Sequence, residues 1–228
     1  MVDLRWNGFV ASLILLAVPL FSVDVDTEEL DTISDTSVEF INYEGPHDRI
    51  DTREEIIGIG RSLASSLAGD RDTATYAGKY RLAHVVDPGG GTGLDADILY
   101  LLPSSEVDHI VNVRRILAGY LERAYDYSLN DALLLAEFVT IYNAVYRGRL
   151  EYFSQSYKAM VLEYLSSDGV GIATVYREWP GNTELAIPLS EEAAEGGLGS
   201  LDSDVLTEEE VVDEMRKQED RGIPSRKD

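Results

Sequence analysis

The chain has 228 residues, of which 42 are acidic and 19 are basic, so its formal net charge is −23. This balance argues against direct binding to nucleic acid, because phosphates require a basic protein face. The chain contains no cysteine, which excludes disulfides, thiolate metal sites and a cysteine nucleophile. Its hydrophobic content of 44% is typical of a globular protein.

The first 22 residues have the pattern of a signal peptide. Arg5 precedes the apolar run Phe9–Phe21, whose thirteen residues are too few to span a bilayer as a helix. We therefore predict cleavage near Ser22 and an exported mature chain without a transmembrane span. A periplasmic or envelope-associated location is expected, with surface exposure as a further alternative. An uncleaved N-terminal anchor or a buried strand is the competing interpretation of this run.

Charge divides the remaining chain into three parts. Residues 24–55 carry twelve acids and two bases, and residues 190–228 carry thirteen acids and five bases, whereas the middle is nearly balanced. Acidic segments of this kind are typical of solvated, flexible arms, with partner binding as the alternative. The expected organisation is a signal peptide (1–22), an acidic N-terminal arm (23–50), a globular domain (51–190), and an acidic linker with a short charged helix (191–228).

The globular part begins with one helix and two strands. Thr52–Glu55 has the form of a capping box, and apolar residues at helical spacing follow until Gly69. Tyr80–Val86 and Ile98–Leu102 then have the pattern of strands. These two strands are expected to pair as a hairpin across the glycine-rich loop Asp87–Gly93.

Three helices and a second hairpin are expected next. The helices run from about Asp108, from Ser128 to about Arg147, and from Leu150 to Tyr164. The second hairpin pairs Val170–Tyr176 with Thr183–Ile187 across a Pro-Gly turn. A short helix capped at Thr207 ends the pattern. Together these elements predict an α+β fold, in which antiparallel hairpins pack against three to four helices between acidic flexible termini.

The glycine-rich loop and the aspartates around it are two candidate ligand-binding motifs. The loop is followed by Leu94 and Asp95 where a phosphate-binding loop needs lysine and a hydroxyl residue, so nucleotide binding is not predicted. Asp87, Asp95 and Asp97 flank the same loop and form a candidate calcium site, because hard cations bind oxygen ligands. Their spacing does not match an EF-hand, and aspartate is also common in turns for local reasons.

The rest of the sequence gives little sign of catalysis. His84 lies in a predicted strand and is expected to pack in the core, while Asp108 and His109 are sequence neighbours that diverge on a helix. No Gly-x-Ser-x-Gly motif supplies a nucleophile. We therefore predict no enzyme activity and no cofactor. The rival hypothesis is a metal-dependent module, calcium-binding or hydrolytic, that uses the three aspartates and His109.

Four residues are candidates for partner binding. Arg177, Trp179 and Asn182 surround the Pro-Gly turn, where an exposed tryptophan would serve as a binding hot spot. Packing of Trp179 against the helices is an equal alternative. Arg114 lies at the edge of an apolar helix face, and pairing with an internal carboxylate is favoured over binding an anion.

Several segments in order resemble the spirochaetal 83/100-kilodalton antigen family, over about Ile50–Ser190. The sharpest blocks are Val107–Leu121, Thr140–Gly148, Gly169–Ala173, Tyr176–Thr183 and Ile187–Ser190, with His84–Pro88 and Leu94–Ile98 less sharp.

The resemblance implies an exported envelope antigen without established catalytic residues. It also implies a long charged helical segment and a further C-terminal region, whereas this sequence stops at Asp228, as a short paralogue or an incomplete reading frame would. The expected function is a non-catalytic envelope protein with a structural role or with a protein or cell-wall partner. A surface adhesin for host proteins is an alternative.

Overall fold

A computed structural model describes residues 38–45, 52–67 and 72–220, and the statements below concern those residues. The signal peptide, most of the acidic N-terminal arm and the last eight residues lie outside them. The helices and strands in chain order are α1 (Arg53–Leu67), β1 (Thr73–Tyr76), β2 (Tyr80–Val85), β3 (Asp95–Leu101), α2 (Ile110–Tyr125), α3 (Leu129–Val145), α4 (Leu150–Ser156), α5 (Ala159–Leu162), β4 (Thr183–Leu189), α6 (Ser203–Leu206) and α7 (Glu209–Asp220). Two short 3-10 helices, η2 (Tyr176–Glu178) and η3 (Ala193–Glu195), flank β4.

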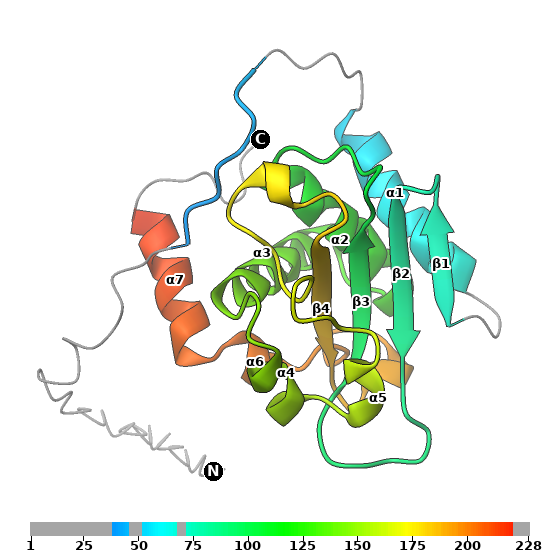
Figure 1. The fold of residues 1–228 in the computed structure, drawn as a ribbon. Coiled ribbons are helices and arrows are strands. Elements are labelled where there is room, and N and C mark those ends of the chain that lie inside the picture. Colours follow the sequence, from blue (N-terminus) through cyan, green and yellow to red (C-terminus); the bar gives the residue numbers. More distant parts are fainter. Residues whose placement is uncertain (1–37, 46–51, 68–71, 221–228) are drawn as a thin grey trace, which may run out of the picture. The chain divides into compact units, whose positions relative to one another are not determined.

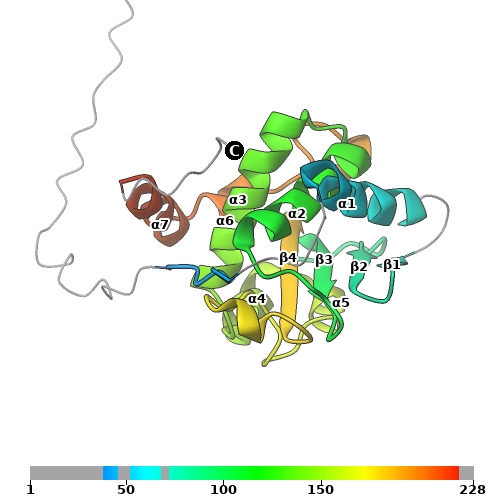
Figure 2. The ribbon, with the colours of Figure 1, turned by 90° about the horizontal axis from the view of Figure 1, so that it is seen from above.

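The strands form one antiparallel sheet in the order β1-β2-β3-β4 (Figure 1). Helices α1, α2 and α3 cover one face, and α4 and α5 lie against the other (Figure 2). Alternate side chains of β3 point to these two layers. The carboxylate of Asp97 meets Tyr120 of α2, whereas the hydroxyl of Tyr100 donates to the carbonyl of Tyr164 beyond α5 (2.8 Å). The predicted α+β class is confirmed.

The first two helices pack with their backbones in close contact. A Cβ atom added to Gly60 would overlap the carbonyl of Ile116, and one added to Gly119 would overlap the carbonyl of Ile57. Only glycine fits at both positions, so the sequence fixes how closely α1 approaches α2. The capping box predicted for α1 is present, because Thr52 and Glu55 exchange backbone-to-side-chain hydrogen bonds.

The predicted hairpin across the glycine-rich loop is confirmed by the pairing of β2 with β3. The predicted second hairpin is wrong. β4 pairs with β3 instead, and Val170 and Gly171 make only isolated bridges to Glu184. The Pro-Gly turn itself forms, with φ of +72° at Gly181 and a hydrogen bond from Asn182 to the carbonyl of Trp179, but it connects η2 to β4.

Arg147 gives the physical reason for the missing strand. Its guanidinium donates to the carbonyls of Gly169, Gly171 and Asn182 at 2.9–3.2 Å. The amide of Ile172 bonds back to the carbonyl of Asn143 in α3. Backbone groups that a hairpin would use are therefore taken by the end of α3.

The acidic segments before and after the predicted globular domain also contain packed residues, although their charge predicts solvated arms. Val38 is buried, and the amide of Gln218 in α7 donates to its carbonyl (3.2 Å). Helix α7 packs against α3 and buries Val211, although this helix is rich in acids. A polar outer face with one apolar stripe is sufficient to dock such a helix.

Candidate functional site

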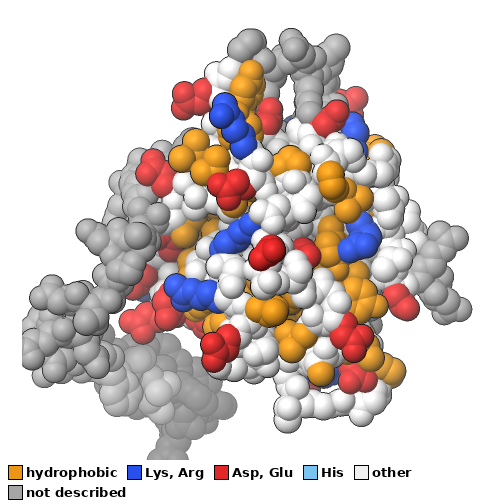
Figure 3. Space-filling view, in the orientation of Figure 1, with side chains coloured by type: hydrophobic (Ala, Val, Ile, Leu, Met, Phe, Trp, Pro, Cys, Tyr) orange, Lys and Arg blue, Asp and Glu red, His pale blue; other side chains and the backbone are white. Residues whose placement is uncertain are grey.

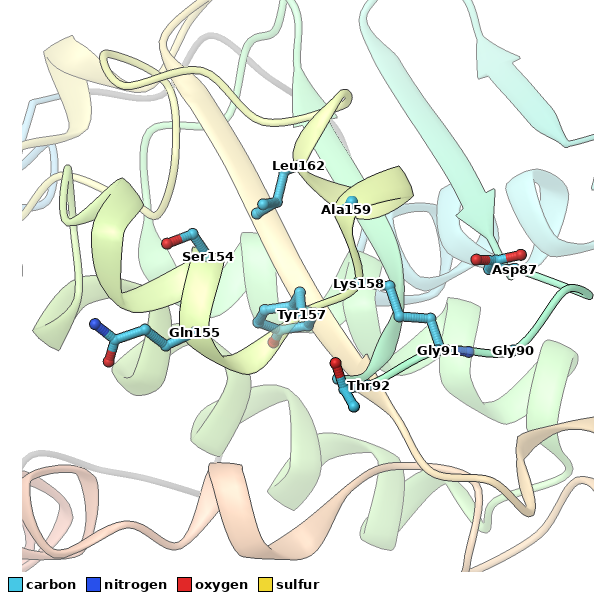
Figure 4. A pocket seen from close by; sticks show the side chains of 11 residues that line it. Asp87, Gly90, Gly91, Thr92, Ser154, Gln155, Tyr157, Lys158, Ala159 and Leu162 are labelled. Carbon is cyan, nitrogen blue, oxygen red and sulfur yellow. The ribbon is translucent and has the colours of Figure 1, made fainter.

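A cleft of about 430 Å³ lies between the loop that joins β2 to β3 and the chain of α4 and α5 (Figure 4). This volume is in the range of small-ligand sites. We call it the glycine-loop cleft. It is lined by Asp87, Gly90, Gly91, Thr92, Gly93, Ser154, Gln155, Tyr157, Lys158, Ala159 and Leu162.

A break in a predicted helix builds one wall of the cleft. The sequence predicts a continuous helix from Leu150 to Tyr164, but α4 ends at Ser156 and α5 begins at Ala159. Between them, Leu94 forms a parallel bridge with Tyr157, through hydrogen bonds to Ser156 and Lys158. The glycine-rich loop thus takes backbone groups that a continuous helix would have used internally.

Gly93 allows this close approach of two backbones. Its φ is +101°, and a Cβ atom at this position would lie 2.8 Å from the carbonyl carbon of Tyr157. Any other residue would strain the loop or push the two segments apart. Gly93 is therefore the residue of the glycine run that packs the loop against the chain between α4 and α5.

The break turns Lys158 inward, where its ammonium pairs with the carboxylate of Asp95 (2.8 Å). The Lys158 side chain is only 13% exposed, so the pair is partly shielded from water. Asp95 also accepts from the backbone amide of Asp87 (2.9 Å), and Asp87 in turn accepts from the amide of Gly89 (2.8 Å). These bonds fix the start of the loop against the wall of the cleft.

Residues of the loop that line the cleft carry polar groups without a hydrogen-bond partner among the described residues. The backbone amides of Gly91, Thr92 and Gly93 donate to none of the described residues, and the side chains of Thr92 and Gln155 make no hydrogen bond with them either. Ala159 and Leu162 supply apolar surface. The cleft therefore combines free hydrogen-bonding groups with an apolar wall, which is the usual composition of a small-ligand site.

A second polar cluster lies on the opposite side of the sheet. Asp97 is fully buried, and both Tyr120 and Tyr125 donate to its Oδ2 atom at 2.5 Å. The half-buried ring of His84 places Nδ1 2.6 Å from Oδ1 of the same carboxylate. We call this group the Asp97 network. Each oxygen of the carboxylate is satisfied, as a buried charge requires.

Electrostatics within the Asp97 network follow from these contacts. The hydrogen bond to Asp97 raises the pKa of His84, because it favours the protonated imidazole, and burial opposes this only in part. Burial raises the pKa of Tyr120 and of Tyr125, and the neighbouring Asp97 carboxylate adds to the effect. Both tyrosines are therefore neutral hydrogen-bond donors at any physiological pH.

The candidate calcium site is not assembled. Asp97 belongs to the Asp97 network, Asp95 pairs with Lys158, and Asp87 binds its own loop. Within the described residues, no group of three or more histidine, aspartate or glutamate side chains is arranged to hold a metal ion. His109 caps α2, since its Nδ1 accepts from the amide of Val111 (3.2 Å). Aspartates favour the ends of turns and strands, which explains why the three lie close together in the sequence without forming a metal site.

The candidate binding residues have different surroundings. Trp179 has 0% exposure, and its Nε1 donates to the carbonyl of Ala173 (2.7 Å), so the packing alternative holds and the exposed hot spot is absent. Arg177 is exposed and donates to the hydroxyl of Tyr176 (2.9 Å). Asn182 closes the turn and offers its carbonyl to Arg147.

Arg114 is buried and makes the internal pair that its position on α2 favours. Its guanidinium donates to Oγ1 of Thr140 (2.9 Å) and to Glu137 (3.2 Å), both on α3. Burial lowers the pKa of Arg114, with the Glu137 carboxylate opposing that effect. The residue thus ties α2 to α3 and is not part of an exposed anion site.

The sequence pattern does not indicate that four residues of these sites have a role there, namely Lys158, Thr92, Tyr120 and Tyr125. No local signal marks the two tyrosines, because they become partners of Asp97 only when α2 packs on the sheet. Lys158 lies within a helical pattern of the sequence. The sequence therefore gives no sign of the break between α4 and α5 that turns Lys158 inward. The positive φ that the glycine run permits was the one available sign that this loop approaches another backbone closely.

The fold and the two polar clusters define an α+β protein with a four-stranded antiparallel sheet and a glycine-rich cleft beside it. Among the described residues, no helix is long and apolar enough to cross a membrane. The chain belongs to the Borrelia P83/100 protein family, whose pattern it matches over residues 27–228. This agrees with the resemblance found in the sequence and extends it on both sides. No curated protein and no solved structure matches the chain.

Proposed function

We propose that the chain is an exported, non-catalytic protein of the cell envelope, which binds a protein or cell-wall component through the glycine-loop cleft. Three lines of argument support the proposal. Its first residues have the pattern of a signal peptide, it belongs to the Borrelia P83/100 protein family, and its cleft has free polar groups but a fixed ion pair.

The proposal rests mainly on how the ionisable groups of the cleft and of the Asp97 network are paired. Lys158 and Asp95 neutralise each other, and Asp97 receives three side-chain contacts. A general base needs a substrate or a nucleophile within hydrogen-bond reach. Among the described residues, His84 contacts Asp97 and no serine or threonine hydroxyl. This arrangement favours binding over catalysis.

The surface around the cleft supports a specific contact over a charge-driven one. On the face shown in Figure 3, acidic and basic side chains are interspersed with apolar ones, and neither sign forms a continuous field. Partner choice on such a face depends on the shape and hydrogen bonds of a defined site. The glycine-loop cleft is a site of this kind.

Protease treatment of intact source cells, followed by mass spectrometry of peptides from residues 51–190, tests the location. The proposal predicts a chain cleaved near Ser22 and recovered from the envelope or periplasm. Cleavage of the domain on intact cells would favour the adhesin role towards host proteins, whereas protection until the envelope is opened would favour a periplasmic partner. An uncleaved chain in the cytoplasmic fraction would contradict the proposal.

A further inference from the structure

The glycine-loop cleft has a composition that selects among ligand classes, and we infer that it binds an uncharged, hydroxyl-rich ligand, namely a short saccharide. This inference rests on the proposed function, because it names the chemistry of a cell-wall partner for the same cleft. It is carried by the donors, acceptors, charges and apolar surface of the lining residues.

The residues that line the cleft supply both donors and acceptors, spread along it from Asp87 to Gln155 (Figure 4). The unused amides of Gly91, Thr92 and Gly93 are donors, and the carboxylate of Asp87 is an acceptor. The hydroxyl of Thr92 and the carboxamide of Gln155 each offer both functions. A saccharide hydroxyl is itself both a donor and an acceptor, so a ring with several hydroxyls satisfies such a mixed set. A ligand with donors only, or acceptors only, leaves part of it unsatisfied.

The charges at the cleft disfavour an anion. Lys158 is the one cation among the lining residues, and it is neutralised by Asp95 at 2.8 Å. Asp87 then adds a negative charge that no basic side chain pairs with among the described residues. A phosphate or carboxylate ligand would have to displace Asp95 from Lys158 and approach Asp87. The three free amides alone do not offset this repulsion, so an uncharged ligand is favoured.

The shape of the cleft also suits a sugar ring. Figure 4 places Thr92 and the glycine-rich loop on one side of Tyr157, Ser154 and Gln155 of α4 on another, and Leu162 above it. Ala159 and Leu162 provide an apolar wall for the C–H face of a ring, while the loop provides the hydrogen bonds. A volume of about 430 Å³ suits a ligand of one or two rings.

Nuclear magnetic resonance titration of the full chain tests the inference with defined probes. The neutral probes are the disaccharide of N-acetylglucosamine and maltose, and the anionic probes are glucuronate and inorganic phosphate. We expect at least one neutral probe to shift the amide signals of residues 87–93 and 154–162 in a saturable way. The anionic probes should not shift these signals at the same concentration.

Two variants and a matched control localise the binding. Thr92→Val and Gln155→Leu each remove hydrogen-bonding groups from exposed side chains that make no hydrogen bond with the other described residues, so both should fold normally. Each should weaken saccharide affinity about five-fold, since a hydrogen bond contributes about 1 kcal/mol. Thr75→Val changes the same side chain on β1, outside the cleft, and should leave the affinity unchanged.

Three outcomes would overturn the inference. The first is the absence of a saturable shift with any neutral probe. The second is a saturable shift of the cleft signals with an anionic probe alone. The third is an equal saccharide affinity for Thr92→Val and Thr75→Val. None of them contradicts the proposed function if the chain is still processed and found in the envelope. A cytoplasmic chain that binds saccharide would instead contradict the proposed function and leave the inference standing.

Discussion

The Asp97 network and the glycine-loop cleft are supported by the same strand, yet they treat polar groups in opposite ways. Asp97 is fully buried and receives contacts from Tyr120, Tyr125 and His84. Two residues earlier, Asp95 holds Lys158 at the edge of a cleft where backbone amides remain unused. A closed, satisfied network stabilises the fold, whereas an open one leaves hydrogen-bonding groups for a ligand. Substitutions in the two regions should therefore change different properties.

The largest effect is expected from Asp97→Asn. The amide cannot accept from three neighbours as the carboxylate does, and its NH₂ group would face donors. We expect the free energy of unfolding to fall by about 3 kcal/mol, as when one member of a buried charged network is removed. Urea denaturation measures this. Asp204→Asn, at an exposed position in α6, is the matched control and should change stability by less than about 0.5 kcal/mol. Equal losses in both variants would show that Asp97 has no special role.

The next effect is expected in the cleft, from Gly93→Ala. The added Cβ meets the backbone of Tyr157 and the residue has a positive φ, so stability should fall by about 2 kcal/mol and the amide signals of residues 154–162 should shift. Gly90→Ala shares the positive φ but meets nothing within 4 Å, so it isolates the conformational cost. We expect about 1 kcal/mol for Gly90→Ala, without the shifts in α4 and α5. Identical spectra for the two variants would contradict the packing role of Gly93.

A smaller effect is expected from Lys158→Met. The change leaves the partly buried carboxylate of Asp95 with the amide of Asp87 as its remaining partner. Because water still reaches this pair, thermal unfolding should show a loss of about 1 kcal/mol, well below that of Asp97→Asn. A loss as large as that of Asp97→Asn would remove the distinction between an open and a closed region.

The smallest effect is a pH dependence that comes from His84. Its pKa is raised in the folded state, so its contribution to stability is complete below the unfolded pKa of about 6.5 and is lost as the pH rises through the folded value. Stability measured from pH 5.5 to pH 9 should therefore include a decline that His84→Gln removes. An unchanged pH profile in this variant would show that His84 does not pair with Asp97 in solution.

Local signals predicted the elements that depend on local chemistry. The capping box at Thr52, the cap of α3 at Ser128, the β2–β3 hairpin and the turn at Gly181 are all present. Each depends on residues a few positions apart. The fold class follows from these elements, although β1 was not predicted because four residues with one buried side chain give almost no periodic signal.

Long-range competition for backbone groups explains the rest. Val170 and Gly171 have the composition of a strand, but Gly148 and Arg147, just beyond α3, take their carbonyls. Lys158 lies in a helical pattern, but Leu94 takes its amide. The candidate site could be located near the glycine-rich loop from sequence, since Asp87 and the glycines line the cleft. Its second wall could not, because it exists only when residues about 60 positions apart in the chain bond to one another.

The most direct test is to measure unfolding free energy and saccharide affinity together for Asp97→Asn and Thr92→Val, at a temperature where both variants are folded. We expect Asp97→Asn to lose about 3 kcal/mol of stability and to keep its affinity. We expect Thr92→Val to keep its stability and to lose about five-fold in affinity. A Thr92→Val variant that binds saccharide as tightly as the unchanged chain would contradict the assignment of binding to the cleft. An Asp97→Asn variant as stable as the unchanged chain would contradict the assignment of stability to the Asp97 network.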